Sequence, residues 1–219
     1  MSECTRTVFH KDTFEKISDS KREKIFEVAI TEFAANGYSG TNINTIAKNA
    51  DISIGSMYNY FQSKEDLFLS IVDHGYGILE KALSEVITEN GSICEIIERL
   101  FRITSAYTKT HKEMNQIYLD LSTQGLSDLS KRLSCKMETI TNELYSQILK
   151  NAKDKDEISG DIDENLMAFY IDNLLVMYQF SLTSNYYKER MEIFLGEETC
   201  KDNEKIIMAM VEYIRKALA

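Results

Sequence analysis

The chain has 219 residues, contains no proline and only nine glycines, and carries a formal net charge of −10. Its apolar fraction of 43% and charged fraction of 27% are typical of a globular protein with a buried core. The negative charge argues against a protein that coats nucleic acid or membranes non-specifically. The scarcity of proline and glycine favours long helices over a strand-and-turn fold.

The residue pattern of the N-terminal part of the chain predicts one amphipathic helix preceded by an arm. Residues 1–17 mix charged and scattered apolar residues, and we expect an arm or a frayed helix extension there. Ser20-Lys21-Arg22-Glu23 has the form of a capping box, and apolar residues at spacing four follow from Ile25 to Phe33. Asn36-Gly37 ends this helix, because glycine accepts the left-handed turn that other residues resist.

Two very short helices follow, which is unusual for a generic bundle. Asn42 is a good N-cap for the first, and Asp51-Ile52-Ser53 interrupts it after roughly two turns. Ser53 caps the second, whose apolar residues Met57 and Phe61 are four apart. The segment Ser63-Lys64-Glu65-Asp66 then caps a long helix that extends to about residue 86.

The remainder also has helical patterns. Ser92-Ile93-Cys94-Glu95 is a second capping box, and a helical segment around 114–121 follows its helix. We predict a long helix over about 126–152, a charged loop over 153–160, an apolar helix over about 162–182 and a last helix over about 203–217.

The segment from Thr41 to Phe61 fits a helix-turn-helix. This motif needs a short first helix, a tight turn and a second helix whose N-terminal end is bare enough to enter the major groove of DNA. Gly55 and Ser56 leave backbone N–H groups accessible at that end. Short polar groups suited to base edges are Asn44, Ser56 and Asn59, and groups suited to phosphate oxygens are Tyr58, Tyr60 and Lys64.

Residues 20–68 resemble the N-terminal domain of the TetR family of regulators. Turn, cap, aromatic and lysine positions all have the expected spacing, as in Gly37-Tyr38, Ile46-Ala47, Ile52-Ser53 and Lys64-Glu65-Asp66-Leu67. The resemblance implies a homodimer with a three-helix DNA-binding domain and a larger helical ligand-binding domain. It also implies that a ligand moves the two recognition helices apart and releases the operator.

The resemblance and the chemistry of the side chains together give the candidate DNA-binding residues. They are Thr41, Asn42, Asn44, Ser53, Gly55, Ser56, Tyr58, Asn59, Tyr60 and Lys64. Ile54 stands where many relatives carry a polar or basic group, and Asn59 stands where an aromatic is frequent, so base preference is not transferable. Residues 1–66 hold eight Lys and Arg against ten Asp and Glu. DNA binding must therefore depend on aimed hydroxyl groups, backbone N–H groups and Lys64 rather than on a general positive field, and we expect its salt dependence to be shallow.

The apolar helix over 162–182 is apolar nearly all round, which predicts burial on more than one side. The resemblance implies that it forms a four-helix dimer interface with the last helix and their partners; the alternative is the core of a monomer. An effector pocket mixes aromatic, methionine and polar side chains. The candidates are Tyr107, His111, Tyr118, Met137, Tyr170, Asn173 and Met177.

The sequence thus predicts an all-α protein with an arm (1–17), a helix-turn-helix domain (18–66) and a helical effector-binding and dimerisation domain (67–219). We predict a cytoplasmic regulator, most simply a repressor released by a small molecule, although an activator fits the same pattern. Three distant histidines and the lack of a phosphate-binding glycine loop argue against an enzyme, a cofactor or a metal site. Two competing hypotheses are a hairpin within a helical bundle and a helical interaction protein that binds no DNA.

The cysteines and the termini agree with this class. Cys4, Cys94, Cys135 and Cys200 form no Cys-x-x-Cys pair, which indicates neither a disulfide framework nor a zinc site. The N-terminal residues lack the apolar core of a signal peptide, so we expect none, and no stretch approaches the roughly 18 apolar residues that span a bilayer.

Overall fold

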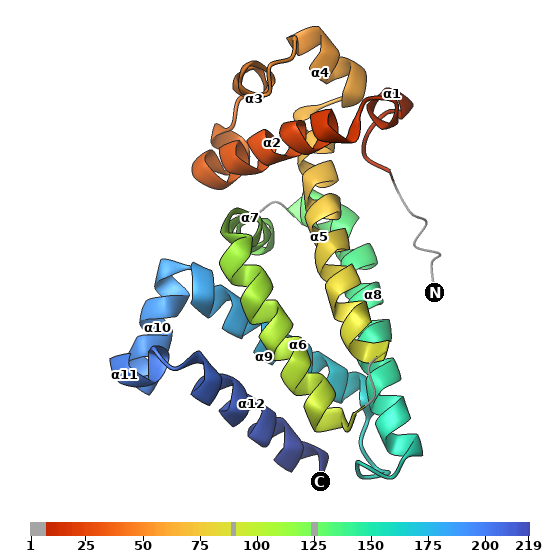
Figure 1. The fold of residues 1–219 in the computed structure, drawn as a ribbon, viewed down its shortest axis with the longest axis vertical. Coiled ribbons are helices and arrows are strands. Elements are labelled where there is room, and N and C mark those ends of the chain that lie inside the picture. Colours follow the sequence, from red (N-terminus) through yellow and green to blue (C-terminus); the bar gives the residue numbers. More distant parts are fainter. Residues whose placement is uncertain (1–7, 89–90, 124–126) are drawn as a thin grey trace. The chain divides into compact units, whose positions relative to one another are not determined.

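The computed structural model describes residues 8–88, 91–123 and 127–219, and every element within these ranges is a helix (Figure 1). The predicted all-α class is therefore confirmed. The helices are α1 (Asp12–Glu15), α2 (Asp19–Gly40), α3 (Ile43–Asn49), α4 (Ile54–Tyr60), α5 (Lys64–Thr88), α6 (Ile93–Thr110), α7 (Lys112–Thr123), α8 (Ser127–Asp154), α9 (Glu164–Thr183), α10 (Asn185–Leu195), α11 (Glu197–Cys200) and α12 (Asn203–Leu218).

The chain forms two compact units. The first contains the residues up to Gly77 together with Glu113–Lys136, and the second contains Ile78–Lys112 and Met137–Ala219. The long helices α5 and α8 each contribute residues to both units. No helix of the described part is long and apolar enough to cross a membrane.

The core of the first unit joins α2, α4 and α5. Phe33 and Phe61 are fully buried. The ring centroid of Phe33 lies 5.0 Å from that of Phe68, in an edge-to-face contact. The predicted break at Gly37 is confirmed, because this residue adopts φ 66° and ψ 171° inside α2. Only glycine adopts such a backbone conformation without strain, and it turns the chain towards α3.

Local capping signals predicted most helix starts correctly. Asn42, Ser53 and Ser63 each accept a hydrogen bond from a backbone N–H of the first turn that follows. Ser92 and Glu95 form the predicted capping box. The predicted capping box at Ser20 is wrong: α2 already begins at Asp19, because the carbonyl of Ser18 accepts the N–H groups of residues 21 and 22.

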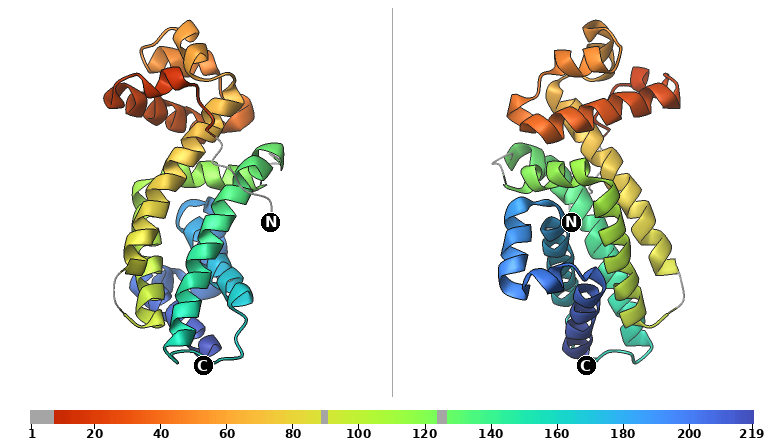
Figure 2. Two further views of the ribbon diagram at one scale, coloured as in Figure 1. Left: turned by 90° about the vertical axis from the view of Figure 1, so that its right-hand side faces the viewer. Right: turned by 60° about the vertical axis from the view of Figure 1, so that its left-hand side comes forward.

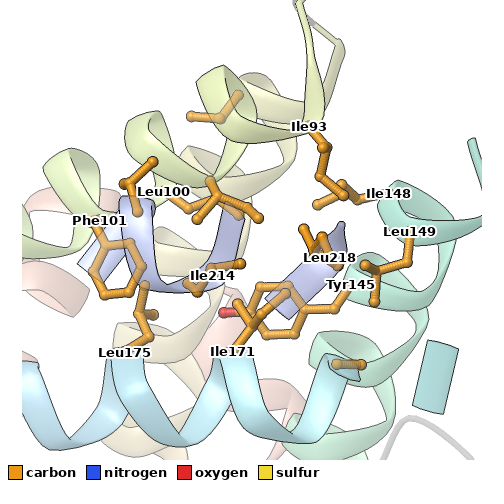
Figure 3. Close-up of a cluster of buried hydrophobic side chains, with 14 of the residues drawn as sticks. Ile93, Leu100, Phe101, Tyr145, Ile148, Leu149, Ile171, Leu175, Ile214 and Leu218 are labelled. Carbon is orange, nitrogen blue, oxygen red and sulfur yellow. The ribbon is translucent and has the colours of Figure 1, made fainter. Parts of the chain in front are cut away.

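The second unit has its own core, in which α6 packs against α9 and α12, and α10 packs against α9 (Figure 2). Aliphatic side chains fill the space between Phe101 of α6 and Tyr145 of α8, with Ile171 and Leu175 of α9 between them (Figure 3). The short helices α10 and α11 lie in a stretch where the sequence patterns predict no helix. Neither contributes a fully buried side chain.

Candidate nucleic-acid interface

Helices α3 and α4 form a compact helix-turn-helix in the first unit. Their connection is tight: the N–H of Ile52 donates to the carbonyl of Ala47 at 3.0 Å, and Asp51 adopts φ 60°. Aspartate tolerates this left-handed conformation better than most residues do. The turn therefore reverses the chain within four residues and starts α4 at Ile54.

Helix α4 has one buried and one exposed face. Met57 is buried in the core, whereas Tyr58 is 46% exposed and Asn59 is also exposed. Ile54 and Gly55 lie one turn earlier on the same exposed face, since residues three or four apart share a face. The whole helix is seven residues long, and none of its side chains is charged.

The fold itself does not require a glycine at position 55. A Cβ atom built there would have as its nearest contact the hydroxyl oxygen of Ser53, at 3.8 Å, an ordinary van der Waals distance. The residue is helical, so alanine would be a better helix former at this site. The missing side chain leaves room outside the protein, on the face that a partner would approach.

Polar side chains shape the starts of both helices. The Oδ1 atom of Asn42 accepts from the backbone N–H of Asn44 at 2.9 Å and from its side-chain amide at 3.1 Å. The hydroxyl of Ser53 accepts from the N–H of Ser56 at 3.0 Å, and the two hydroxyl oxygens are 2.9 Å apart. These four predicted contact residues are thus held in fixed orientations at the helix starts.

Two predicted contact residues belong to the core instead. Thr41 is 4% exposed, and its hydroxyl donates to the carbonyls of Gly37 at 2.7 Å and Glu32 at 3.1 Å. Tyr60 is 8% exposed, and its ring centroid lies 5.8 Å from that of Phe14. The prediction of exposed contacts at both positions is corrected, because sequence spacing did not reveal which side of each element faces the core.

Lys64, which the sequence predicts to bind phosphate, makes hydrogen bonds within the protein. Its ammonium donates to the carbonyl oxygens of Tyr38 at 2.8 Å, Thr41 at 3.0 Å and Ser39 at 3.4 Å. It also lies 4.8 Å from the centroid of the Tyr38 ring. An ammonium has three donors, and three carbonyls of the α2–α3 turn accept them. The side chain predicted to bind phosphate is therefore bonded to the protein's own backbone.

Sequence reasoning missed the residues that contact the end of α4. Lys11 and Thr13, in the predicted arm, both donate hydrogen bonds to carbonyls of this helix. The stretch offered one signal, the apolar residues Phe9 and Phe14 among charged neighbours, but a pair of aromatics does not identify the element that they pack against.

The predicted effector residues do not form one group. Tyr107 and His111 stack at the end of α6 with ring centroids 4.2 Å apart, and burial raises the pKa of Tyr107 to about 12. Tyr118 belongs to the other compact unit. The side chain of Met137 lies outside the described residues.

The three candidates on α9 are corrected, since they lie on its exposed face. Tyr170 is 55% exposed, Met177 and Asn173 are exposed as well, and the amide of Asn173 donates to the carbonyl of Phe169 at 2.7 Å. With Leu166 and Phe169 they form one stripe along the helix, which we call the α9 outer face (Leu166, Phe169, Tyr170, Asn173 and Met177). The opposite stripe contains the buried residues Ala168, Ile171, Leu175 and Tyr178.

A half-buried carboxyl group on α9 escaped the sequence analysis. Burial first, and then the negative charge of Glu138 on α8, raise the pKa of Asp172 to about 6. Burial also raises the pKa of Glu138. Asp172 lies within an otherwise apolar stretch of α9, and its burial depends on the helices packed around it.

Comparison with known proteins agrees with this architecture. Residues 25–71, which include α3 and α4, match the family described as bacterial regulatory proteins, tetR family. The chain is 26% identical over 165 residues to the "Fatty acid metabolism regulator protein" of Bacillus subtilis (strain 168), which covers 70% of this chain and 85% of the relative. It is 24% identical over 162 residues to the biofilm operon icaADBC negative transcriptional regulator IcaR of Staphylococcus epidermidis, which covers 73% of this chain and 85% of the relative.

The fold also matches solved structures. The transcriptional regulator FadR of Bacillus subtilis, solved in complex with stearoyl-CoA, superimposes with a TM-score of 0.68 at 19% identity, over 90% of this chain and 96% of that chain. A bacterial regulatory protein of the tetR family from Rhodococcus RHA1 gives a TM-score of 0.68 at 18% identity, over 93% of this chain and 98% of that chain. The helix-turn-helix thus lies in a segment that matches the tetR family of bacterial regulatory proteins, and the chain shares its helical fold with solved regulatory proteins.

Proposed function

We propose that this protein is a repressor that binds a pseudo-palindromic operator as a homodimer and is released by a small-molecule effector. In this proposal residues 18–66 read DNA, residues 67–219 bind the effector and form the dimer, and the protein acts in the cytoplasm. The observation that carries the proposal is the uncharged, exposed face of α4, on which Gly55 leaves space that the fold itself does not require.

The face of α4 suits the major groove of DNA. Tyr58 offers a hydroxyl to phosphate oxygens, and Asn59 offers an amide to base edges. The backbone at Gly55 lets the duplex approach the start of the helix. The proposed contacts are Asn42, Asn44, Ser53, Gly55, Ser56, Tyr58 and Asn59. Thr41, Tyr60 and Lys64 support these contacts from within the protein.

A selection experiment tests DNA binding. The wild-type protein is used to enrich duplexes from a randomised pool, and the enriched duplex is titrated with wild type, Tyr58→Ala and the control Tyr186→Ala. Tyr186 is an exposed tyrosine on α10, in the other unit. We expect the α4 variant to bind at least tenfold more weakly and the control to bind as wild type. Failure of the wild type to enrich any duplex would contradict the proposed function.

The α9 outer face supports the proposed dimer. Phe169 is 62% exposed, and Leu166 and Tyr170 extend the same apolar stripe. Apolar side chains at the spacing i, i+3, i+4 lie on one side of a helix and are stabilised when another helix covers them. In the proposed dimer, α9 and α12 of one protomer pack against the same helices of its partner. Tyr170 and Met177 then act in assembly rather than in effector binding.

The effector that we propose is a long-chain acyl thioester. The support is the solved relative in complex with stearoyl-CoA together with the relative named as a regulator of fatty acid metabolism. In this chain the stacked Tyr107 and His111 offer polar groups at the end of α6. Stearoyl-CoA, coenzyme A and stearate are added separately to the protein–DNA complex. We expect only the thioester to release the duplex; release by none of them would overturn this effector class while leaving DNA binding intact.

A further inference from the structure

The C-terminal end of α4 is completed by residues that lie more than forty positions earlier in the sequence. The last four carbonyl groups of a helix have no partner within it, and in α4 these belong to Met57, Tyr58, Asn59 and Tyr60. The N–H of Phe61 donates to the first of them at 2.9 Å. Three carbonyls therefore remain to be satisfied from outside the helix.

All three carbonyls accept hydrogen bonds from Lys11 and Thr13. The ammonium of Lys11 donates to the carbonyl of Tyr58 at 2.8 Å, and its backbone N–H donates to that of Tyr60 at 2.8 Å. The hydroxyl of Thr13 donates to the carbonyl of Asn59. A positive charge at this end also interacts favourably with the helix dipole. Two residues thus supply every missing donor of the recognition helix.

An aromatic contact holds these donors in place. Phe14 is 1% exposed, and its ring centroid lies 4.7 Å from that of Phe61, 5.1 Å from that of Phe26 and 5.8 Å from that of Tyr60. The four-residue helix α1 is far too short to be stable by itself. Its conformation therefore depends on the burial of Phe14 between α2 and the end of α4.

A second set of bonds joins the same segment to α2. The guanidinium of Arg22 donates to the carbonyl of Glu15 at 3.0 Å and to its carboxylate at 3.3 Å. His10 and Glu15 are paired across α1 at 2.6 Å. Residues 9–15 are thus bonded on one side to α2 and on the other to α4. The matched family segment begins only at residue 25, so residues 9–15, which supply the donors to α4, lie outside it.

We infer that residues 9–15, the N-terminal clasp, act as an external C-terminal cap that holds the recognition helix in the orientation that DNA binding requires. Lys11 and Thr13 are the positioning residues, and neither needs to touch DNA. The inference rests on the proposed DNA-binding function. A helix of two turns frays easily at an uncapped end. Only molecules with an intact recognition helix bind DNA, so the apparent affinity for DNA falls as the frayed fraction grows.

Conservative variants of the full chain test this role. Thr13→Val removes the hydroxyl donor at constant size, and Lys11→Met removes the ammonium but keeps an unbranched side chain. Lys16→Met is the matched control, because Lys16 is an exposed lysine directly after the clasp and its replacement removes the same charge. Phe14 is left intact so that the segment stays folded, and melting curves verify that each variant remains folded.

Two measurements separate positioning from direct contact. We expect Thr13→Val and Lys11→Met each to weaken binding of the enriched duplex roughly fivefold to tenfold, as the loss of one hydrogen bond would. The salt slope of binding should match that of the Lys16→Met control. Hydrogen exchange at the amides of Tyr60 and Phe61 should accelerate in both variants and not in the control.

The inference fails if the Lys11→Met, Thr13→Val double variant leaves both affinity and exchange unchanged. It also fails if Lys11→Met makes the slope of log affinity against log salt shallower by about 0.9 than Lys16→Met does. That result would show that the Lys11 ammonium contacts a DNA phosphate. A wild-type protein that enriches no duplex would refute the proposed function alone. The exchange measurement would still decide whether the clasp orders α4.

Discussion

The ammonium of Lys64 both donates to the carbonyl oxygen of Tyr38, at 2.8 Å, and lies over the ring of the same residue. Lys64 is the first residue of α5, where the helix dipole disfavours a positive charge. The carbonyls at the end of α2 offset this cost. The lysine therefore links the end of α2 to the start of α5, across the segment that contains α3 and α4.

Replacement of Lys64 by methionine should lower stability and DNA affinity together. Loss of a charged donor to backbone carbonyls costs about 2 kcal/mol, and we expect a lower denaturant midpoint with an unchanged m-value. The salt slope of DNA binding should stay as in wild type. Lys64→Arg retains the charge but replaces the compact ammonium by a planar fork, so it should restore neither property. A lower slope with full stability would instead establish a phosphate contact.

The substitution Gly55→Ala should separate stability from function. The site has room for a Cβ atom and a helical backbone, so the free energy of unfolding should stay constant or rise by up to about 1 kcal/mol. Binding of the enriched duplex should fall at least tenfold, because the methyl group lies on the face that approaches DNA. Gly160→Ala, at an open position in the second unit, is the control. Full DNA affinity in Gly55→Ala would remove α4 from the interface.

A charge on the α9 outer face should dissociate the proposed dimer. Phe169→Asp would place a carboxylate among Leu166 and Tyr170, where desolvation in an interface penalises it by several kcal/mol. Light scattering should then report a monomer, and binding of a duplex with two half-sites should weaken. Ile193→Asp, at an exposed apolar residue of α10, provides the comparison. A dimer that persists in Phe169→Asp and dissociates in Ile193→Asp would move the interface to α10.

Asp172 predicts a pH dependence of stability. Its pKa is raised from 3.8 to about 6, so between these values the folded protein binds more protons than the unfolded chain. Stability from this group is then fully present below about pH 4 and falls as the pH rises through about 6. Asp172→Asn should remove this fall, with a higher melting temperature than wild type at pH 7.5 and an equal one at pH 3.5. Glu189→Gln, at an exposed site on α10, should leave the profile unchanged, and equal melting temperatures of Asp172→Asn and wild type at pH 7.5 would contradict the assignment.

Local signals in the sequence predicted the helices well. Capping at Asn42, Ser53 and Ser92 depends on residues within one turn, and the break at Gly37 depends on that residue's own backbone. Such features need no knowledge of the tertiary fold. Together with the spacing of aromatic and lysine residues, they were sufficient to predict the helix-turn-helix and its resemblance to the TetR family.

The directions of individual side chains were not predictable in the same way. Tyr58 and Tyr60 are two residues apart on α4, and the second is buried on the same side as Met57, where it packs against Phe14. The bonds of Lys64 to the α2–α3 turn depend on contacts between residues more than twenty positions apart. The apolar surface of α9 likewise divides into two faces only when α6 and α8 cover one of them. These features are tertiary, and periodicity alone does not encode them.

The N-terminal clasp has a consequence for the exchange of specificity between related regulators. A chimera that receives only residues 41–64 from a relative would acquire new reading side chains on α4. The chimera would still depend on Lys11 and Thr13 to cap the C-terminal end of α4. These two residues would then cap a helix from another protein, with which they did not evolve. Transplanted recognition helices should therefore function best when the donor's own first two dozen residues accompany them.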